Sequence, residues 1–225
     1  MNRSYRKAQS GFTLVEIAIV LVIIGLLIGG VLKGTELIEN SKVKRAASEI
    51  NGITAALYSY QDRYQRLPGD DGPLATLTTR GGSWATVTLA ANPPNGVIAA
   101  TLAQTFTAAG EGGAQFWSHL RAAGFVNGDH TLTGVAALPR NAFGGLIGIT
   151  TQAVGAPPLN GKMVCLSQVP GKAAAALDTQ MDDGNGNSGK MRATLGAAGT
   201  NAAPTAAALA VPYNETSEYT ICTQM

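Results

Sequence analysis

A single carboxylate, Glu16, interrupts an apolar run that extends over residues 12–32 and carries no other charge. The run is long enough to cross a bilayer as a helix, because a membrane core takes about 20 apolar residues. A carboxylate in such a helix costs about 2.5–3.5 kcal/mol on insertion scales, and acids in this position are usually paired and functional. The run itself contains no cation. A cut of the chain directly before the run, between Gly11 and Phe12, would create one, because Phe12 would then carry a free N-terminal amine.

Two pairings of this amine with Glu16 are open. The amine of Phe12 in one subunit can meet Glu16 of a neighbouring subunit, which neutralises both charges and sets the axial stagger between two chains. Alternatively, the two groups meet within one chain, four residues apart on a helix. The two arrangements do not exclude each other, but only the first gives Glu16 a role in assembly.

The segment before the run, residues 1–10, contains Arg3, Arg6 and Lys7 and no acidic residue. Positive charge beside a membrane span favours the cytoplasmic side. A secretory signal peptide fits poorly, because its apolar region is shorter and ends at a small-residue cleavage site. The sequence predicts instead a cut in front of the run, which removes residues 1–11 as a leader peptide.

The chain resembles the type IV prepilins over Gly11-Phe12-Thr13-Leu14-Val15-Glu16 and the Leu/Val/Ile-rich run that follows. This family includes the pilins of type IV pili and the pseudopilins of type II secretion systems. The resemblance implies that a prepilin peptidase cleaves between Gly11 and Phe12 and methylates the amine of Phe12. The implied partners are other pilin subunits, an inner-membrane assembly platform and membrane lipid. The implied location is the bacterial inner membrane, with the C-terminal domain outside the cytoplasm, and then a filament.

An apolar stripe continues beyond the membrane run in alternating steps of three and four residues, which is the period of one helix face. Its members are Val43, Ala46, Ile50, Ile53, Leu57, Tyr60 and Tyr64. The pattern predicts one N-terminal helical segment over residues 12–66, about 80 Å long. Its first part, 12–32, spans the membrane or enters a filament core, and Pro68 and Gly69 stop the helix.

Glycines at four positions lie where the two halves of this helix meet: Gly25, Gly29, Gly30 and Gly34. Each glycine in a helix interior costs about 1 kcal/mol relative to alanine. They indicate either a segment that bends or unwinds during assembly, or close packing between membrane helices.

The remainder, residues 67–225, predicts one globular domain, so the fold class is α+β with an antiparallel sheet packed on the long helix. Strands are expected at 146–151, 163–169 and 218–223, where β-branched residues stand between Gly and Pro. Short helices are expected at 114–124 and 170–182. Two stretches rich in Ala, Thr and Gly, 75–104 and 196–211, predict either surface loops or edge strands.

The two cysteines, Cys165 and Cys222, fall in expected strands of this domain. Disulfides persist in oxidising compartments outside the cytoplasm, and type IV pilins often close their C-terminal region with one. The resemblance therefore implies a Cys165–Cys222 disulfide, which would stabilise the domain by about 4 kcal/mol in the chain-entropy model. The alternative is two free buried thiols.

A loop with alternating oxygen ligands, Asp182, Asp183, Asn185 and Asn187, follows the second short helix. Calcium takes six to eight such ligands, and some secretion pseudopilins bind calcium in a C-terminal loop. No bidentate glutamate follows at the spacing of an EF-hand, so a solvated turn built by Asp and Asn side chains is the alternative. No cofactor is otherwise required.

Composition and motifs do not predict an enzyme. His119 lies in an expected helix beside Trp117 and is interpreted as a packing or surface residue, whereas His130 lies in a loop. Neither belongs to a catalytic or zinc-binding motif. The formal net charge of +2 over 225 residues gives no reason to expect contact with nucleic acid.

Three functions remain open. The chain is a structural subunit of a type IV pilus or similar filament, a pseudopilin of a type II secretion system, or a non-polymerising membrane-anchored adhesin or binding protein. Glu16 favours the two filament-forming functions over the anchored binding protein, because a simple anchor has no use for a buried acid and a stacking helix does.

Overall fold

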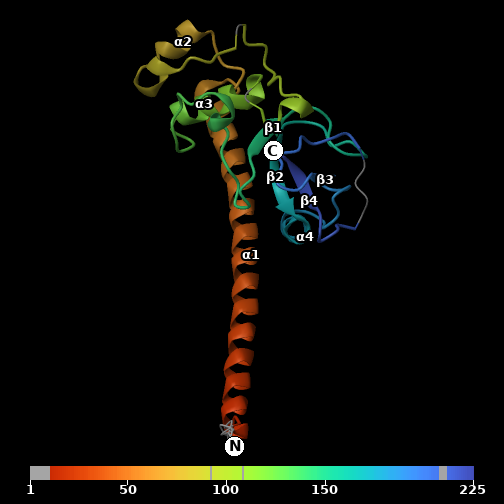
Figure 1. The fold of residues 1–225 in the computed structure, drawn as a ribbon. Helices are drawn as coiled ribbons and strands as arrows, with labels where there is room; N and C mark the ends of the chain where they lie inside the picture. Colours follow the sequence, from red (N-terminus) through yellow and green to blue (C-terminus); the bar gives the residue numbers. More distant parts are fainter. Residues whose placement is uncertain (1–10, 92, 108, 208–211) are drawn as a thin grey trace, which may run out of the picture. The chain divides into compact units, whose positions relative to one another are not determined.

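The computed structural model describes residues 11–91, 93–107, 109–207 and 212–225. The chain forms two compact units, which divide between Ser41 and Lys42. One continuous helix, α1 (Leu14–Tyr64), contributes to both units (Figure 1). It ends where Gln65 takes a positive φ of 53°, the left-handed conformation in which helices commonly stop. The predicted long N-terminal helix is confirmed.

The first unit exposes the apolar side chains of α1. Among the described residues, α1 is the one helix long and apolar enough to cross a membrane, and its most apolar window has a mean hydropathy of 2.9. Beyond the adjacent residues and the nearby backbone of α1 itself, a Cβ added at any of the four glycines at positions 25, 29, 30 and 34 would meet no atom within 4 Å. Contacts within this chain therefore do not require glycine at these positions. If glycine is required there, the reason is close packing against lipid or a neighbouring helix.

In the second unit, one face of α1 enters the hydrophobic core. The buried residues are Val43, Ala46, Ala47, Ile50, Ile53, Ala56, Leu57 and Tyr60. They form one core cluster with side chains of the sheet and of α3 (Phe116–Ala122). These residues include six of the seven members of the predicted stripe, with Ala47 and Ala56 added on either side of it, whereas Tyr64, the last member, is only partly buried.

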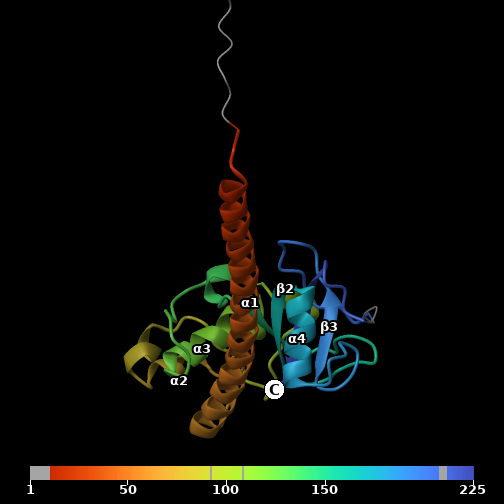
Figure 2. The ribbon, with the colours of Figure 1, turned by 90° about the horizontal axis from the view of Figure 1, so that it is seen from below.

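The sheet has four antiparallel strands in the order β1-β2-β4-β3. Their bounds are β1 Ile147–Thr150, β2 Met163–Pro170, β3 Met191–Leu195 and β4 Glu218–Gln224. Helix α4 (Gly171–Met181) lies against β2 and β4 (Figure 1), and Figure 2 shows it beside β2. The α+β class is confirmed, and β3 is a strand that the sequence analysis missed.

Loops and short helices make up the rest of the second unit. The stretch 75–104 contains most of α2 (Leu74–Thr78) and two 3₁₀ turns, Gly82–Thr86 and Leu102–Gln104. Within its described residues it contains no strand, and residues 196–207 form none either, so the edge-strand alternative is wrong there. A π-helical segment, Glu111–Gln115, directly precedes α3, and a 3₁₀ turn, Gly134–Ala137, follows it.

Candidate functional site

Thr13 and Glu16 cap the N-terminus of α1. Both the backbone N–H and the hydroxyl of Thr13 donate to Oε2 of Glu16, at 2.8 Å and 2.9 Å. In return the backbone N–H of Glu16 donates to the Thr13 hydroxyl oxygen at 3.3 Å. This reciprocal arrangement is a capping box, which satisfies backbone donors that the first helical turn leaves unpaired. The sequence analysis missed Thr13, although Thr-x-x-Glu is a readable capping pattern.

The expected cleavage site lies directly before this cap. Gly11 and Phe12 are exposed and precede the first residue of α1, so the peptide bond between them lies in non-helical backbone. A Cβ at Gly11 would meet nothing within 4 Å. Residues 1–10 of the expected leader lie outside the described part of the chain. In this uncleaved chain the nitrogen of Phe12 is an amide, and Thr13 provides the hydrogen bonds to Glu16.

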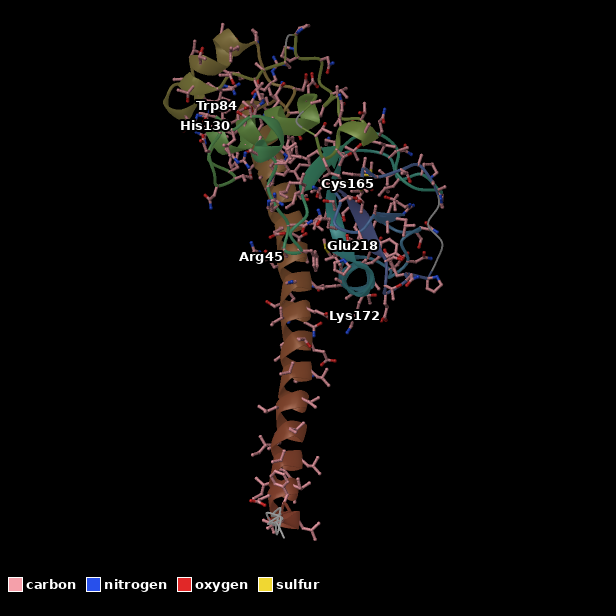
Figure 3. The ribbon with its side chains drawn as sticks, viewed as in Figure 1. Arg45, Trp84, His130, Cys165, Lys172 and Glu218 are labelled. Atoms are coloured by element: carbon pink, nitrogen blue, oxygen red, sulfur yellow. A yellow bond between two sulfur atoms is a disulfide. The ribbon has the colours of Figure 1, made fainter. Side chains whose placement is uncertain are left out.

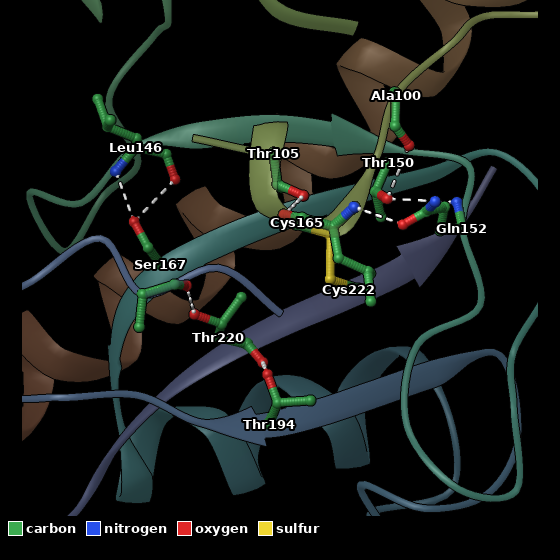
Figure 4. The surroundings of a disulfide bond; sticks show 12 residues. Ala100, Thr105, Leu146, Thr150, Gln152, Cys165, Ser167, Thr194, Thr220 and Cys222 are labelled. Carbon is green, nitrogen blue, oxygen red and sulfur yellow. Dashed lines mark hydrogen bonds between the residues drawn. A yellow bond between two sulfur atoms is a disulfide. The ribbon is translucent and has the colours of Figure 1, made fainter. Parts of the chain in front are cut away.

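The predicted disulfide joins Cys165 and Cys222. The two residues are direct partners in the register of β2 and β4, and both are fully buried. Figure 4 shows the bond between these central strands, with Thr150 nearby on β1 donating to the carbonyl oxygen of Ala100 at 3.1 Å. The structure leaves no free cysteine, which excludes the alternative of two thiols.

A cluster of carboxylates stands at the C-terminal end of α4. One oxygen from each of Asp178, Asp182 and Asp183 lies within 4.8 Å of the others. Burial raises the pKa of Asp178, and the neighbouring charges of Asp182 and Asp183 act in the same direction. The sequence analysis missed Asp178, which lies in the last turn of α4, whereas Asp182 follows the helix in a non-helical conformation.

The loop after α4 has the hydrogen bonds of a polar turn. Asp183 accepts from the backbone N–H of Asn185 at 2.9 Å, and Asn185 accepts from that of Asn187 at 3.2 Å. A hydrogen bond from the Ser188 hydroxyl lowers the pKa of Asp183. The loop after α4 therefore forms the polar turn of Asp and Asn side chains that the sequence analysis gave as the alternative to a calcium site. The three carboxylates of the cluster also offer the hard oxygen ligands that calcium takes, so their chemistry fits such an ion.

The two histidines have structural partners. His119 is fully buried, accepts at Nδ1 from the N–H of Gly69 (3.0 Å), and so donates from Nε2 to the carbonyl of Leu89 (2.8 Å). Burial lowers its pKa, which keeps it neutral at physiological pH. His130 hydrogen-bonds with the Thr86 hydroxyl at 2.7 Å.

Comparison with known proteins gives one match. A family model described as the prokaryotic N-terminal methylation motif matches residues 6–32, which include the expected cleavage site, Glu16 and the whole apolar run. A search of curated proteins finds no match. The matched segment is the one in which the structure places an exposed Gly11–Phe12 bond, a capped carboxylate and an exposed apolar helix. The chain thus carries, at residues 6–32, the N-terminal methylation motif that is the signature of type IV pilin and pseudopilin prepilins.

Proposed function

We propose that this chain is a structural subunit of a type IV pilus or a pilus-like filament. The observation that carries the proposal is the position of Glu16 in the first turn of an apolar helix, directly after the Gly11–Phe12 bond. Over its described residues, 11–41, the first unit buries no large apolar side chain within the chain, so these side chains need lipid before assembly and other helices after it. The second unit supplies the folded outer domain, held by its disulfide.

Cleavage changes the partner of Glu16. Before cleavage, Thr13 is the residue in the described part of the chain that donates hydrogen bonds to this carboxylate. After a prepilin peptidase cuts behind Gly11, Phe12 carries a positive amine in the same short segment. A carboxylate in a membrane is stabilised far more by a cation than by neutral donors. Because each chain then carries one amine and one carboxylate, subunits that stack with a fixed axial offset satisfy both charges repeatedly along a filament.

The same N-terminal features are compatible with a pseudopilin of a type II secretion system, which assembles through the same helix. A non-polymerising anchored adhesin is the second candidate, and it would not need Glu16. The proposal is of a non-enzymatic protein, located in the inner membrane and then in the filament.

The mature chain is expected to begin at Phe12 and to carry one N-methyl group. The reason is the exposed, non-helical Gly11–Phe12 bond directly before the capped helix. Mass spectrometry of the N-terminal peptide, isolated from membranes of cells with an active prepilin peptidase, measures both features. Replacing Gly11 with valine provides the control, and its N-terminal peptide should retain residues 1–11. Wild-type protein that keeps residues 1–11 in such cells would refute the proposal.

We also propose that calcium binds the carboxylate cluster of Asp178, Asp182 and Asp183. Their proximity within 4.8 Å favours it, because neighbouring carboxylates repel one another when ionised and a bound cation would relieve this repulsion. Asn185 and Asn187 lie in the adjoining turn, where the amide oxygen of Asn185 already accepts a backbone hydrogen bond.

Millimolar calcium is expected to raise the melting temperature of the full chain in detergent, because a ligand of the native state adds stability in proportion to RT ln(1 + [L]/Kd). The shift should shrink as pH falls, because Asp178, whose pKa is raised, then becomes protonated. Asp183→Asn should abolish the shift, whereas Asp129→Asn, an exposed acid elsewhere, should retain it. A melting curve that calcium leaves unchanged would show that the segment is a polar turn only.

A further inference from the structure

A cleft of ≈ 470 Å³ opens in the second unit where α1 ends. Two arginines, Arg63 and Arg80, line it together with Tyr64, Trp84 and the hydroxyl-bearing Ser83, and none of its lining residues is acidic. Trp84, labelled in Figure 3, comes from the 3₁₀ turn that follows α2. Clefts of about 300–1,000 Å³ with apolar walls and a few charged groups are typical of small-molecule sites.

Arg80 is held rigidly in this cleft. Its Nη1 and Nη2 donate to the two oxygens of Asp71 at 2.8 Å and 3.2 Å, and Asp71 is only 1% exposed. The guanidinium carbon also lies 4.4 Å from the ring centre of Tyr64 and 4.7 Å from that of Trp84. Because these contacts engage two of the five N–H donors of a guanidinium, Arg80 is a preorganised cation with donors left over.

Arg63 supplies a second cation on the same ring. Its guanidinium carbon lies 5.3 Å from the ring centre of Tyr64, and no carboxylate among the described residues forms an ion pair with it. Asp71 balances the charge of Arg80, so the cleft retains one positive charge. A ligand group with one negative charge and two acceptor oxygens would match this arrangement, and a carboxylate has both properties.

We propose that the cleft between Arg63 and Arg80 binds the carboxylate of a uronic-acid residue in an acidic polysaccharide. The two guanidinium groups and the Ser83 hydroxyl supply donors for the carboxylate and the ring hydroxyls. Tyr64, Ala122 and Ala123, which also line the cleft, supply apolar contact for the C–H face of a sugar. Acidic polysaccharides occur outside the cell, and the location of the second unit there rests on the proposed function. The binding of a uronic acid in the cleft does not depend on that location.

Single-stranded nucleic acid fits this cleft less well. Bases bind through stacking on exposed aromatic faces, but Trp84 is only 5% exposed and Arg80 lies over its ring. The formal net charge of the chain, +2, also lacks the strong positive excess that tracks a phosphate backbone.

The test is calorimetric titration of the full-length chain in a neutral detergent with trigalacturonate at about 0.15 M salt, where long-range attraction is screened. We expect saturable binding of trigalacturonate and none of the uncharged galactose trimer. Arg63→Gln should weaken binding about tenfold, the loss expected for one charge-assisted hydrogen bond. Arg66→Gln should change it less than about twofold, because it removes the same charge from an exposed position outside the cleft.

Three results would overturn the proposal. The first is no binding of trigalacturonate at millimolar concentration. The second is equal weakening by Arg63→Gln and Arg66→Gln, which would indicate general charge attraction. The third is tighter binding of an oligothymidylate than of trigalacturonate, which would indicate a nucleic-acid site. None of these measurements depends on cleavage of the leader or on filament assembly. A negative result would therefore reject the polysaccharide site without rejecting the filament proposal.

Discussion

Replacing Glu16 with valine is expected to leave the protein in the inner membrane and to reduce its incorporation into filaments to background. Insertion should become easier, because a lone acid in a membrane helix is removed. Assembly should fail, because the amine of Phe12 in the neighbouring subunit then enters an apolar core without a counter-charge. An unpaired buried charge costs about 3–5 kcal/mol, which is enough to suppress each stacking step by more than a hundredfold.

Thr13→Val separates assembly from helix capping. It removes the hydroxyl that exchanges hydrogen bonds with Glu16 but retains the carboxylate. Loss of a cap costs about 1 kcal/mol of helix stability, so this variant should still enter filaments. Shearing of cells followed by immunoblotting measures incorporation, and membrane fractions measure insertion. Normal incorporation of Glu16→Val, or equal loss in both variants, would show that Glu16 acts only as a cap.

Asp71→Ala is expected to lower the stability of the second unit by about 3 kcal/mol or more, because it leaves a partly buried arginine without its counter-charge. Asp71 accepts from the Tyr60 hydroxyl at 2.6 Å and from both terminal nitrogens of Arg80. Burial, together with the hydrogen bond to Asp71, raises the pKa of Tyr60, which therefore remains a donor throughout the physiological range. The hydrogen bonds of the Asp71 carboxylate thus connect the segment that follows Pro68 to the C-terminal end of α1.

Thermal unfolding of the full chain, followed by circular dichroism near the aromatic bands, measures this loss. Tyr60→Phe should cost less than Asp71→Ala, because the ion pair with Arg80 survives. Asp62→Ala removes an exposed carboxylate from the same end of α1 and should shift stability by no more than about 0.5 kcal/mol. If the Asp71→Ala and Asp62→Ala variants have the same melting temperature, the buried ion pair between Asp71 and Arg80 contributes little to the stability of the fold.

The structural features that the sequence allowed us to predict are those that follow from local periodicity. The buried face of α1 follows from a spacing that is visible in the sequence, because a helix brings residues three and four apart onto one side. The strands β1, β2 and β4 follow from runs of β-branched residues between turn formers. The capping pair Thr13 and Glu16 was equally readable, because its partners are three residues apart.

Two missed features, the strand β3 and the cleft, depend on contacts between distant segments. β3 contains Thr194 as its one β-branched residue and includes the charged Arg192, so nothing local marks it as a strand. It is a strand because its backbone pairs with β4, and its charged residue is accommodated because Nε of Arg192 donates to the carbonyl of Pro157 at 2.9 Å. The cleft likewise needs Arg63 from α1 and Arg80 from beyond the turn at Pro68 and Gly69, and no spacing rule connects them.

The strand order also determines when the sheet can form as the chain emerges from N- to C-terminus. β1 and β2 are neighbours in both sequence and space, so they can pair as soon as both have emerged. β3 emerges next, but its partner in the sheet is β4, which also carries Cys222. A chain interrupted before Glu218 therefore lacks two strands and the disulfide, although only one strand is missing from its sequence. Until β4 arrives, β3 and the edge of β2 have unpaired backbone groups, which makes a nascent chain of this length a substrate for chaperones and proteases.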